Sequence, residues 1–247
     1  MKTASLFLSA LAIALVPSLA VAQTSDSMAI ESADVEVVSD GKVYQSYLAA
    51  PTDGGPFPGI VLIHSFNGLE AGYRTMTDQL ARQGFVVVAV GWQTFEQSPS
   101  DALVSQLVQD SIAFLTARDD VDPQRLGLTG FCAGGRYTML LLPQLDAFGA
   151  GVAWYGFPYR GEPAAASLVE DLTAPILILH GTADSPSPVA DIYRYATELT
   201  EAGKSFELKV YFGEPHGFML ADGQMRTDEV AGDAFQEMAS FFQRKLG

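Results

Sequence analysis

The chain contains few cysteines, histidines and basic side chains for its length. Its 247 residues include one cysteine, three histidines, and 14 Lys and Arg against 29 Asp and Glu, giving a formal net charge of −15. A single cysteine excludes an internal disulfide. The negative charge argues against nucleic acid and anionic membrane surfaces as partners. No His, Cys or carboxylate cluster has the close spacing of metal ligands, so we expect no metal site.

A long apolar run lies near the start of the chain. Met1-Lys2 gives a positive start, residues 6–16 are almost all apolar, and 20–22 (Ala-Val-Ala) fit a small-x-small cleavage site. The run is too short to span a bilayer comfortably, and Pro17 breaks it. No cysteine follows as a lipid anchor. We therefore expect residues 1–22 to be a signal peptide, with no stable membrane insertion and export to the periplasm or medium.

The remaining residues, 23–247, predict one α/β domain. Two alternating runs, 35–38 and 43–48, flank a Ser-Asp-Gly-Lys turn and predict an antiparallel hairpin. Apolar strands and amphipathic helices then alternate, which indicates right-handed crossovers and a mostly parallel sheet. The expected strands are 59–64, 85–90, 125–129, 150–155, 175–180 and 206–211, and the expected helices are 72–83, 101–118, 137–142, 188–202 and 227–245.

The one cysteine lies in a glycine-framed turn. A short apolar strand ends at Gly-Phe-Cys-Ala-Gly-Gly, residues 130–135, and a helix begins there. A reactive side chain on a tight strand-to-helix turn is typical of a nucleophile elbow, where small neighbours let the two backbones approach. The same pattern also fits a buried cysteine in a glycine-rich loop, a common setting for a free thiol. The Lys and Ser/Thr of a phosphate-binding loop are absent.

Two later loops carry an acid and an imidazole. Asp184 follows the strand 175–180, and His216 follows the strand 206–211. Functional groups gather at the carboxyl ends of strands in sheets of this kind. With Cys132, the chain order is nucleophile, acid, histidine, which is the order of the α/β-hydrolases.

These three residues suit nucleophilic catalysis. A thiol becomes a competent nucleophile when a neighbouring imidazole takes its proton, so His216 is the expected base for Cys132 and later the acid for the leaving group. Asp184 would hold the other ring nitrogen and stabilise the imidazolium. The backbone N–H groups of Ala133 and Phe66 are the expected oxyanion hole.

The elbow at 130–135, the Asp184 loop and the His216-Gly-Phe loop resemble the dienelactone hydrolase family of α/β-hydrolases. The similarity extends from about Val35 to the C-terminal helix. It implies an α/β-hydrolase fold, with helices on both faces of a mostly parallel central sheet and an antiparallel N-terminal hairpin. It also implies hydrolysis of a small-molecule ester or lactone through an acyl-cysteine intermediate, with no cofactor.

Two positions depart from the family's archetype. Ser65 stands where the archetype has a glutamate that manages the thiol's protonation, and Glu70 lies a few residues on. Leu220 stands where the archetype has an arginine that grips the substrate carboxylate, and Arg226 is out of register with that place. We therefore keep ester or lactone hydrolysis as the predicted reaction class, and we do not predict an anionic dienelactone as the specific substrate.

The other histidines and one other aspartate are weaker candidates. His64 and His180 each end a buried strand, where a hydrogen-bonding role is expected because buried imidazoles need partners. Asp191 lies inside the following helix and would point poorly. Asp184 is therefore the expected acid.

Aromatic side chains could form a substrate pocket. Trp92, Tyr155 and Phe218 are our pocket candidates, with Phe157 among further possibilities. Aromatic residues are, however, more often plain core.

Two other functions stay open at this point. The same triad would serve an acyltransferase or thioesterase, since an acyl-cysteine can pass its acyl group to water or to another acceptor. A catalytically silent hydrolase-fold binding protein would fit the missing glutamate and arginine. The sequence does not set the oligomeric state.

Overall fold

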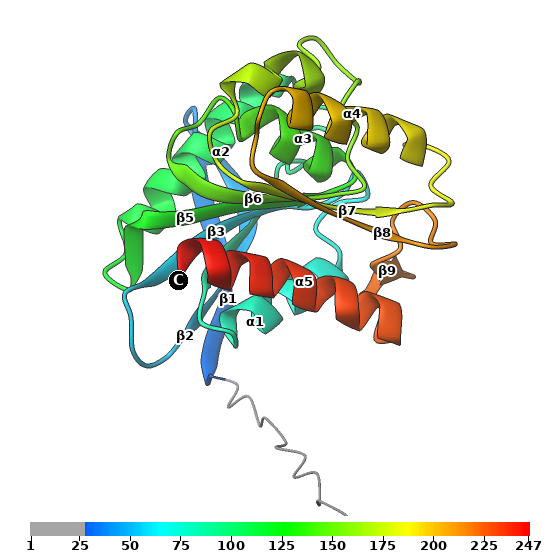
Figure 1. Cartoon of the computed structure of the whole chain (residues 1–247). Helices are drawn as coiled ribbons and strands as arrows, with labels where there is room; N and C mark the ends of the chain where they lie inside the picture. The colour runs from blue at the N-terminus through cyan, green and yellow to red at the C-terminus, as the bar shows by residue number, and fades with distance from the viewer. Residues whose placement is uncertain (1–27) are drawn as a thin grey trace, which may run out of the picture.

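The computed structural model describes residues 28–247, so the expected signal peptide at 1–22 lies outside the described residues. An eight-stranded sheet forms the centre, with the strand order β1-β2-β4-β3-β5-β6-β7-β8 (Figure 1). The strands are β1 Ile30–Ser39, β2 Lys42–Pro51, β3 Phe57–Ile63, β4 Val86–Val90, β5 Val121–Phe131, β6 Phe148–Trp154, β7 Ile176–Gly181 and β8 Phe206–Tyr211.

The sheet is antiparallel at one end and parallel elsewhere. β1 pairs antiparallel with β2, and β2 pairs antiparallel with β4, whereas all the other neighbours run parallel. Asp40 and Gly41 turn the hairpin with positive φ angles of 47° and 69°. This confirms the expected N-terminal hairpin and the mostly parallel sheet.

Helices cover both faces of the sheet (Figure 1). α1 Ala71–Ala81 and α5 Glu229–Leu246 lie on one face, and α2 Asp101–Thr116, α3 Ala133–Leu141 and α4 Val189–Glu201 lie on the other. Ser100 and Asp228 cap the first turns of α2 and α5 by accepting backbone N–H groups, at 3.2 Å each. Each face has its own buried apolar cluster, so the helices hold the sheet rigid from both sides.

Several segments differ from the sequence expectation. β5 begins at Val121 rather than Arg125, and its pairing with β3 is interrupted after Pro58, where the register shifts. The expected strand began too late because Pro123 was read as a break before it, whereas the irregular register accommodates the proline inside β5. A 3₁₀ helix, Ala165–Asp171, and the two-stranded ribbon β9 Leu220–Ala221 with β10 Gln224–Met225 were not expected. They are too short to show a hydrophobic period.

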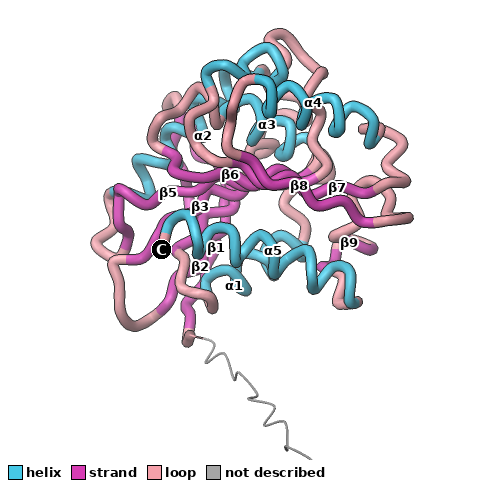
Figure 2. The backbone as a smooth tube through the Cα atoms, in the orientation of Figure 1, coloured by secondary structure: helices cyan, strands magenta, loops and turns pink. Residues whose placement is uncertain are grey.

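The loops and helices pack around the central strands (Figure 2). Because β3 to β8 run parallel, their carboxyl ends lie at one edge of the sheet, and the loops there carry the residues of interest. β3 leads to Ser65 and Phe66, β5 leads to Cys132, and β7 and β8 lead to Asp184 and His216. Among residues 28–247, no helix combines the length and apolar character that crossing a membrane requires.

Candidate active site

Cys132 stands on a strained turn between β5 and α3. Its φ of 58° and ψ of −110° lie outside the regions that non-glycine residues favour. The turn is held by the Cys132 N–H, which donates to the Trp154 carbonyl at 3.0 Å. A Cβ on Gly134 would lie 2.0 Å from the Ile63 carbonyl oxygen, so only glycine permits this approach.

Asp184 and His216 form a close pair from two different loops. Oδ2 of Asp184 lies 2.8 Å from Nδ1 of His216, and its Oδ1 accepts the Ser187 N–H at 2.8 Å. The Asp184 side chain is fully buried, whereas 18% of the His216 side chain is exposed. The carboxylate is thus fixed behind the ring and sets which nitrogen carries the inner proton.

Burial by itself disfavours the charged form of His216, but other contacts outweigh it. The hydrogen bond that the His216 ring donates to Asp184, together with interactions with Cys132, raises the pKa of His216 to about 9. The raised pKa favours the imidazolium form of His216.

Cys132 and His216 both line a cavity of about 540 Å³. Tyr155 lines the same cavity, and its ring lies 5.2 Å from the His216 ring between centroids. The φ of Tyr155 is 36°, and its buried hydroxyl has no hydrogen-bond partner among residues 28–247. Burial raises the pKa of this phenol well above its usual value, so it is a neutral donor.

The two residues expected to form the oxyanion hole lie beside Cys132. Ala133 begins α3 directly after the cysteine, and Phe66 follows β3. Both line a second cavity of about 400 Å³, which also opens at Cys132. Neither backbone N–H donates to an acceptor among residues 28–247, so both remain available to a substrate oxygen.

The structure separates the three aromatic pocket candidates. Tyr155 lines the first cavity and Trp92 the second. Phe218 lines neither of these two cavities. It is buried in the core, where its ring packs against Tyr155 and Tyr211 with centroids 5.5 Å and 5.4 Å away. Phe218 therefore supports a cavity wall rather than forming one.

The other two histidines are buried and lie outside the two cavities. His64 is buried against Trp92, with its Nδ1 2.7 Å from the Ser65 carbonyl, and burial lowers its pKa to about 4. His180 is buried with Nε2 2.8 Å from the Ser187 carbonyl and 3.6 Å from Asp184. Neither lines the two cavities at Cys132.

The positions that depart from the archetype are close to Cys132. Ser65, Glu70 and Leu220 all line the first cavity. Burial raises the pKa of Glu70, while a hydrogen bond with Ser65 acts in the opposite direction. Arg226 is engaged elsewhere: it pairs with Glu214 at 2.6 Å and donates to the Phe218 carbonyl at 2.8 Å, and so ties down the His216 loop.

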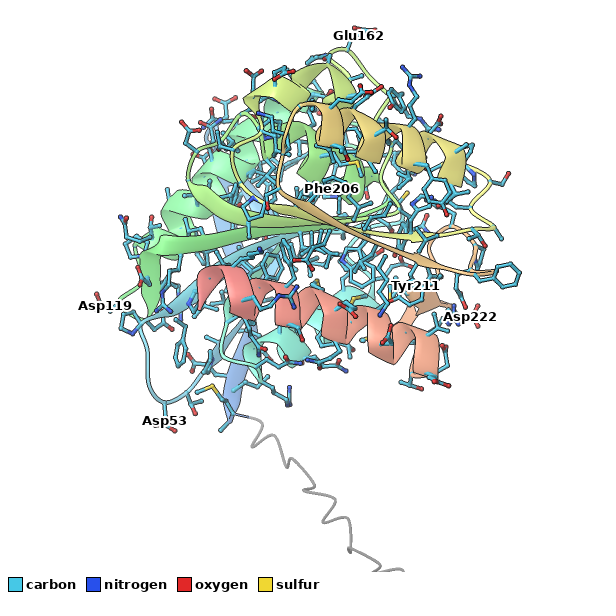
Figure 3. The ribbon with its side chains drawn as sticks, in the orientation of Figure 1. Asp53, Asp119, Glu162, Phe206, Tyr211 and Asp222 are labelled. Carbon is cyan, nitrogen blue, oxygen red and sulfur yellow. The ribbon has the colours of Figure 1, made fainter. Side chains whose placement is uncertain are left out.

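Sequence reasoning missed two residues that line the first cavity, Tyr73 and Asp222. Tyr73 lies in the first turn of α1 and is buried. Asp222 lies in the β9–β10 turn, at the edge of the molecule labelled in Figure 3. The only signal for Tyr73 was its position one turn into the helix that follows β3; nothing in the sequence marked Asp222.

Comparisons with known proteins match most of the chain. The model of the dienelactone hydrolase family matches residues 44–92 and 89–246, a range that includes Cys132, Asp184 and His216. A "Putative carboxymethylenebutenolidase" of Methylorubrum extorquens is 30% identical, with 89% of this chain and 83% of that protein aligned. One of Escherichia coli K12 with the same description is 29% identical, with 92% of each aligned.

A solved structure shows the same fold. The crystal structure of a "Putative Dienelactone Hydrolase" from Klebsiella pneumoniae superposes with a TM-score of 0.78 at 25% identity. The superposition covers 87% of this chain and 99% of that one. The likeness therefore extends over the whole domain rather than one motif.

Proposed function

Because the chain belongs to the dienelactone hydrolase family, we propose that it hydrolyses a carboxylic ester or lactone through an acyl-cysteine intermediate on Cys132. The substrate is a small molecule that reaches the sulfur through the cavities at the end of the sheet. Family membership supports the ester or lactone hydrolase class. The thiol mechanism is our proposal for this chain.

The steps follow from the positions of the three side chains. The Cys132 sulfur, deprotonated by His216, attacks the carbonyl carbon and forms a C–S bond, while the carbonyl oxygen takes up negative charge. The N–H groups of Ala133 and Phe66 stabilise that oxygen. The C–O bond then breaks, and the imidazolium gives its proton to the leaving oxygen. His216 next takes a proton from water, which attacks the thioester, releases the acid and regenerates the thiol.

The observation that carries the proposal is the Asp184–His216 contact of 2.8 Å behind the strained Cys132. The carboxylate of Asp184 accepts the proton on Nδ1 of His216, which keeps the neutral ring in one tautomer. The same carboxylate stabilises the imidazolium once the ring has taken a second proton. The positive φ of Cys132 supports it as well, since strain of this kind gathers at functional sites.

Ester turnover by the full chain and by a Cys132→Ala variant tests the proposal. With aryl acetates, aryl butyrates and a simple lactone, we expect kcat/KM to fall by at least about 10³-fold in the variant, because the acyl-enzyme route is lost. A matched Ser185→Ala variant alters an exposed residue near Asp184 and should keep full activity. Equal activity of Cys132→Ala and the unaltered chain would contradict the thiol mechanism.

We also propose that residues 1–22 are removed during export, leaving one mature domain from Gln23. The positive start, the apolar run and the Ala-Val-Ala site support this. Expression in a bacterium, followed by N-terminal sequencing of the protein in the periplasm and medium, tests it. A protein that stays in the cytoplasm with Met1 intact would contradict it.

A further inference from the structure

Two cavities of different chemistry meet at Cys132. The first is lined by Glu70 and Asp222, whose carboxylates make it acidic. The second is walled by aromatic rings, including Trp92 and Phe157. An ester has two arms on either side of its carbonyl, so the division of the site suggests a division of the substrate.

The position of His216 indicates which cavity binds the alcohol part of the ester and which binds the acyl part. The general acid must reach the leaving oxygen, and His216 lines the first cavity but not the second. On the other side, the ring of Phe157 packs against the imidazole with centroids 5.4 Å apart. The leaving alcohol therefore belongs in the first cavity, which leaves the second cavity for the acyl chain.

The alcohol side contains two carboxylates, and the cationic group that lines it, His216, is already paired with the buried Asp184. Glu70 and Asp222 approach from facing segments, because the Gly72 N–H donates to the Gly223 carbonyl at 2.8 Å and docks the β9–β10 turn on the start of α1. No Lys or Arg lines this cavity, and among residues 28–247 neither carboxylate forms an ion pair.

The nearby arginines are committed elsewhere. Arg74 pairs with Asp34, and Arg226 pairs with Glu214 and Asp228. A negative alcohol entering the first cavity would thus meet two unpaired carboxylates, and the cationic group there, His216, is already paired with Asp184. A neutral polar alcohol, in contrast, can donate hydrogen bonds to the carboxylates of Glu70 and Asp222.

The acyl side is walled mainly by apolar rings, and its unpaired charge among residues 28–247 is Arg160 at the exposed end. The guanidinium of Arg136 is held by both oxygens of Asp101, at 2.8 and 2.6 Å, so it presents no free charge to the cavity. The guanidinium carbon of Arg160 lies over the Phe157 ring, 3.8 Å from the centroid, and this cation–π contact holds the charge away from the cavity interior. Aromatic walls around about 400 Å³ favour an apolar acyl chain.

We propose that this chain selects esters with an apolar acyl group and a polar, uncharged or cationic alcohol, and that Glu70 and Asp222 reject anionic alcohols. This inference rests on the proposed ester hydrolysis at Cys132. Charge at the alcohol changes the interaction with both carboxylates, whereas the length of the acyl chain changes contacts in the other cavity only.

The test for the alcohol side uses three meta-substituted phenyl butyrates: trimethylammonio, its neutral isostere tert-butyl, and carboxylate. Each kcat/KM is divided by that ester's rate of hydrolysis by hydroxide, which removes differences in leaving-group reactivity. For the full chain we expect the cationic ester to be favoured over the anionic one by about tenfold or more, because two carboxylates lie within Coulomb range of the substituent. Added salt should reduce this ratio.

Variants locate the effect. Glu70→Gln and Asp222→Asn should each lower the cation-to-anion ratio about twofold to fivefold, since each removes one charge from a partly exposed wall. Asp119→Asn makes the same charge change at the opposite end of the molecule, as the labels in Figure 3 show, and should leave the ratio as it is.

A further variant tests the acyl side. Ser98→Trp partly fills the second cavity from its exposed rim. This variant should hydrolyse octanoate esters more slowly relative to acetate esters, and its cation-to-anion ratio should be unchanged.

The outcomes separate the two proposals. No hydrolysis of any ester by the full chain would overturn the proposed function and this inference with it. Hydrolysis with a ratio near one, or with a preference for the anionic ester, would overturn the inference alone. A Ser98→Trp variant that changed the charge ratio and spared the acyl preference would show that the arms are seated the other way round.

Discussion

Nδ1 of His216 lies 2.8 Å from Oδ2 of Asp184, although the two residues are 32 positions apart in the chain. The contact forms because β7 and β8 are parallel neighbours whose loops leave the sheet at the same edge. It fixes the orientation of the imidazole that faces the cavity with Cys132. Much of the site's chemistry can be tested through this pair.

Asp184→Asn should reduce turnover while leaving the fold intact. An amide cannot stabilise the imidazolium and favours the wrong tautomer, so kcat should fall by between about tenfold and 10⁴-fold, the upper figure being the loss in serine enzymes of this design. Steady-state kinetics on an aryl butyrate measures it. Asp191→Asn, a change of the same type in α4, should have full activity. Similar losses of kcat in both variants would contradict a specific role for Asp184 in turnover.

His216 should titrate at a much higher pH than the two buried histidines. Proton NMR of the ring hydrogens should show His216 titrating near pH 9 and His64 near pH 4, with His180 below its ordinary value of 6.5. In the His216→Asn variant, the ring signal that titrates at the highest pH should be absent, which assigns that signal to His216. A His216 signal near 6.5 would mean that Asp184 and Cys132 do not stabilise the imidazolium in solution.

The sign of the effect on stability follows from the same shift. The folded protein binds the His216 proton more tightly than the unfolded chain does, because its pKa is raised from 6.5 to about 9. This residue's contribution to the free energy of unfolding is therefore fully present below pH 6.5 and is lost as the pH rises through about 9.

The turn at Cys132 should tolerate no side chain on Gly134. An added Cβ would meet the carbonyl oxygens of Ile63 and His64 at 2.0 and 2.9 Å, and neither backbone group can move cheaply. We expect Gly134→Ala to lower the free energy of unfolding by at least about 2 kcal/mol. Urea denaturation measures it.

Gly232→Ala is the matched control. Gly232 is exposed in α5, and a Cβ there would meet nothing within 4 Å. Alanine should therefore stabilise the helix by up to about 1 kcal/mol. The account of the turn would be contradicted if both alanine variants had the same stability.

The sequence predicted the sheet well, and it singled out three side chains at strand ends, for a physical reason. Strands buried on both faces are continuous apolar runs, and each such run that ends in a loop with a chemically distinctive residue is visible without a structure. Cys132, Asp184 and His216 were found in this way, and the structure gathers their loops at one edge of the sheet.

The walls of the cavities were harder to predict. Tyr73 lines the first cavity from a helix, and Asp222 lines it from the turn of a two-stranded ribbon. Such positions depend on how the segments pack against each other rather than on the local sequence pattern. Phe218 shows the reverse case. It stands next to the His216 loop in sequence, yet its ring turns into the core against Tyr155. Adjacency in sequence does not determine which way a side chain faces in an irregular loop.

The most direct test of the central claim is to find where the acyl group resides during turnover. The full chain is mixed with an aryl butyrate, stopped in acid within the first turnovers, digested and analysed by mass spectrometry. We predict one butyryl group on the peptide that contains Cys132, and none in the Cys132→Ala variant. A butyryl group on another residue, or active turnover with Cys132 never acylated, would contradict the account.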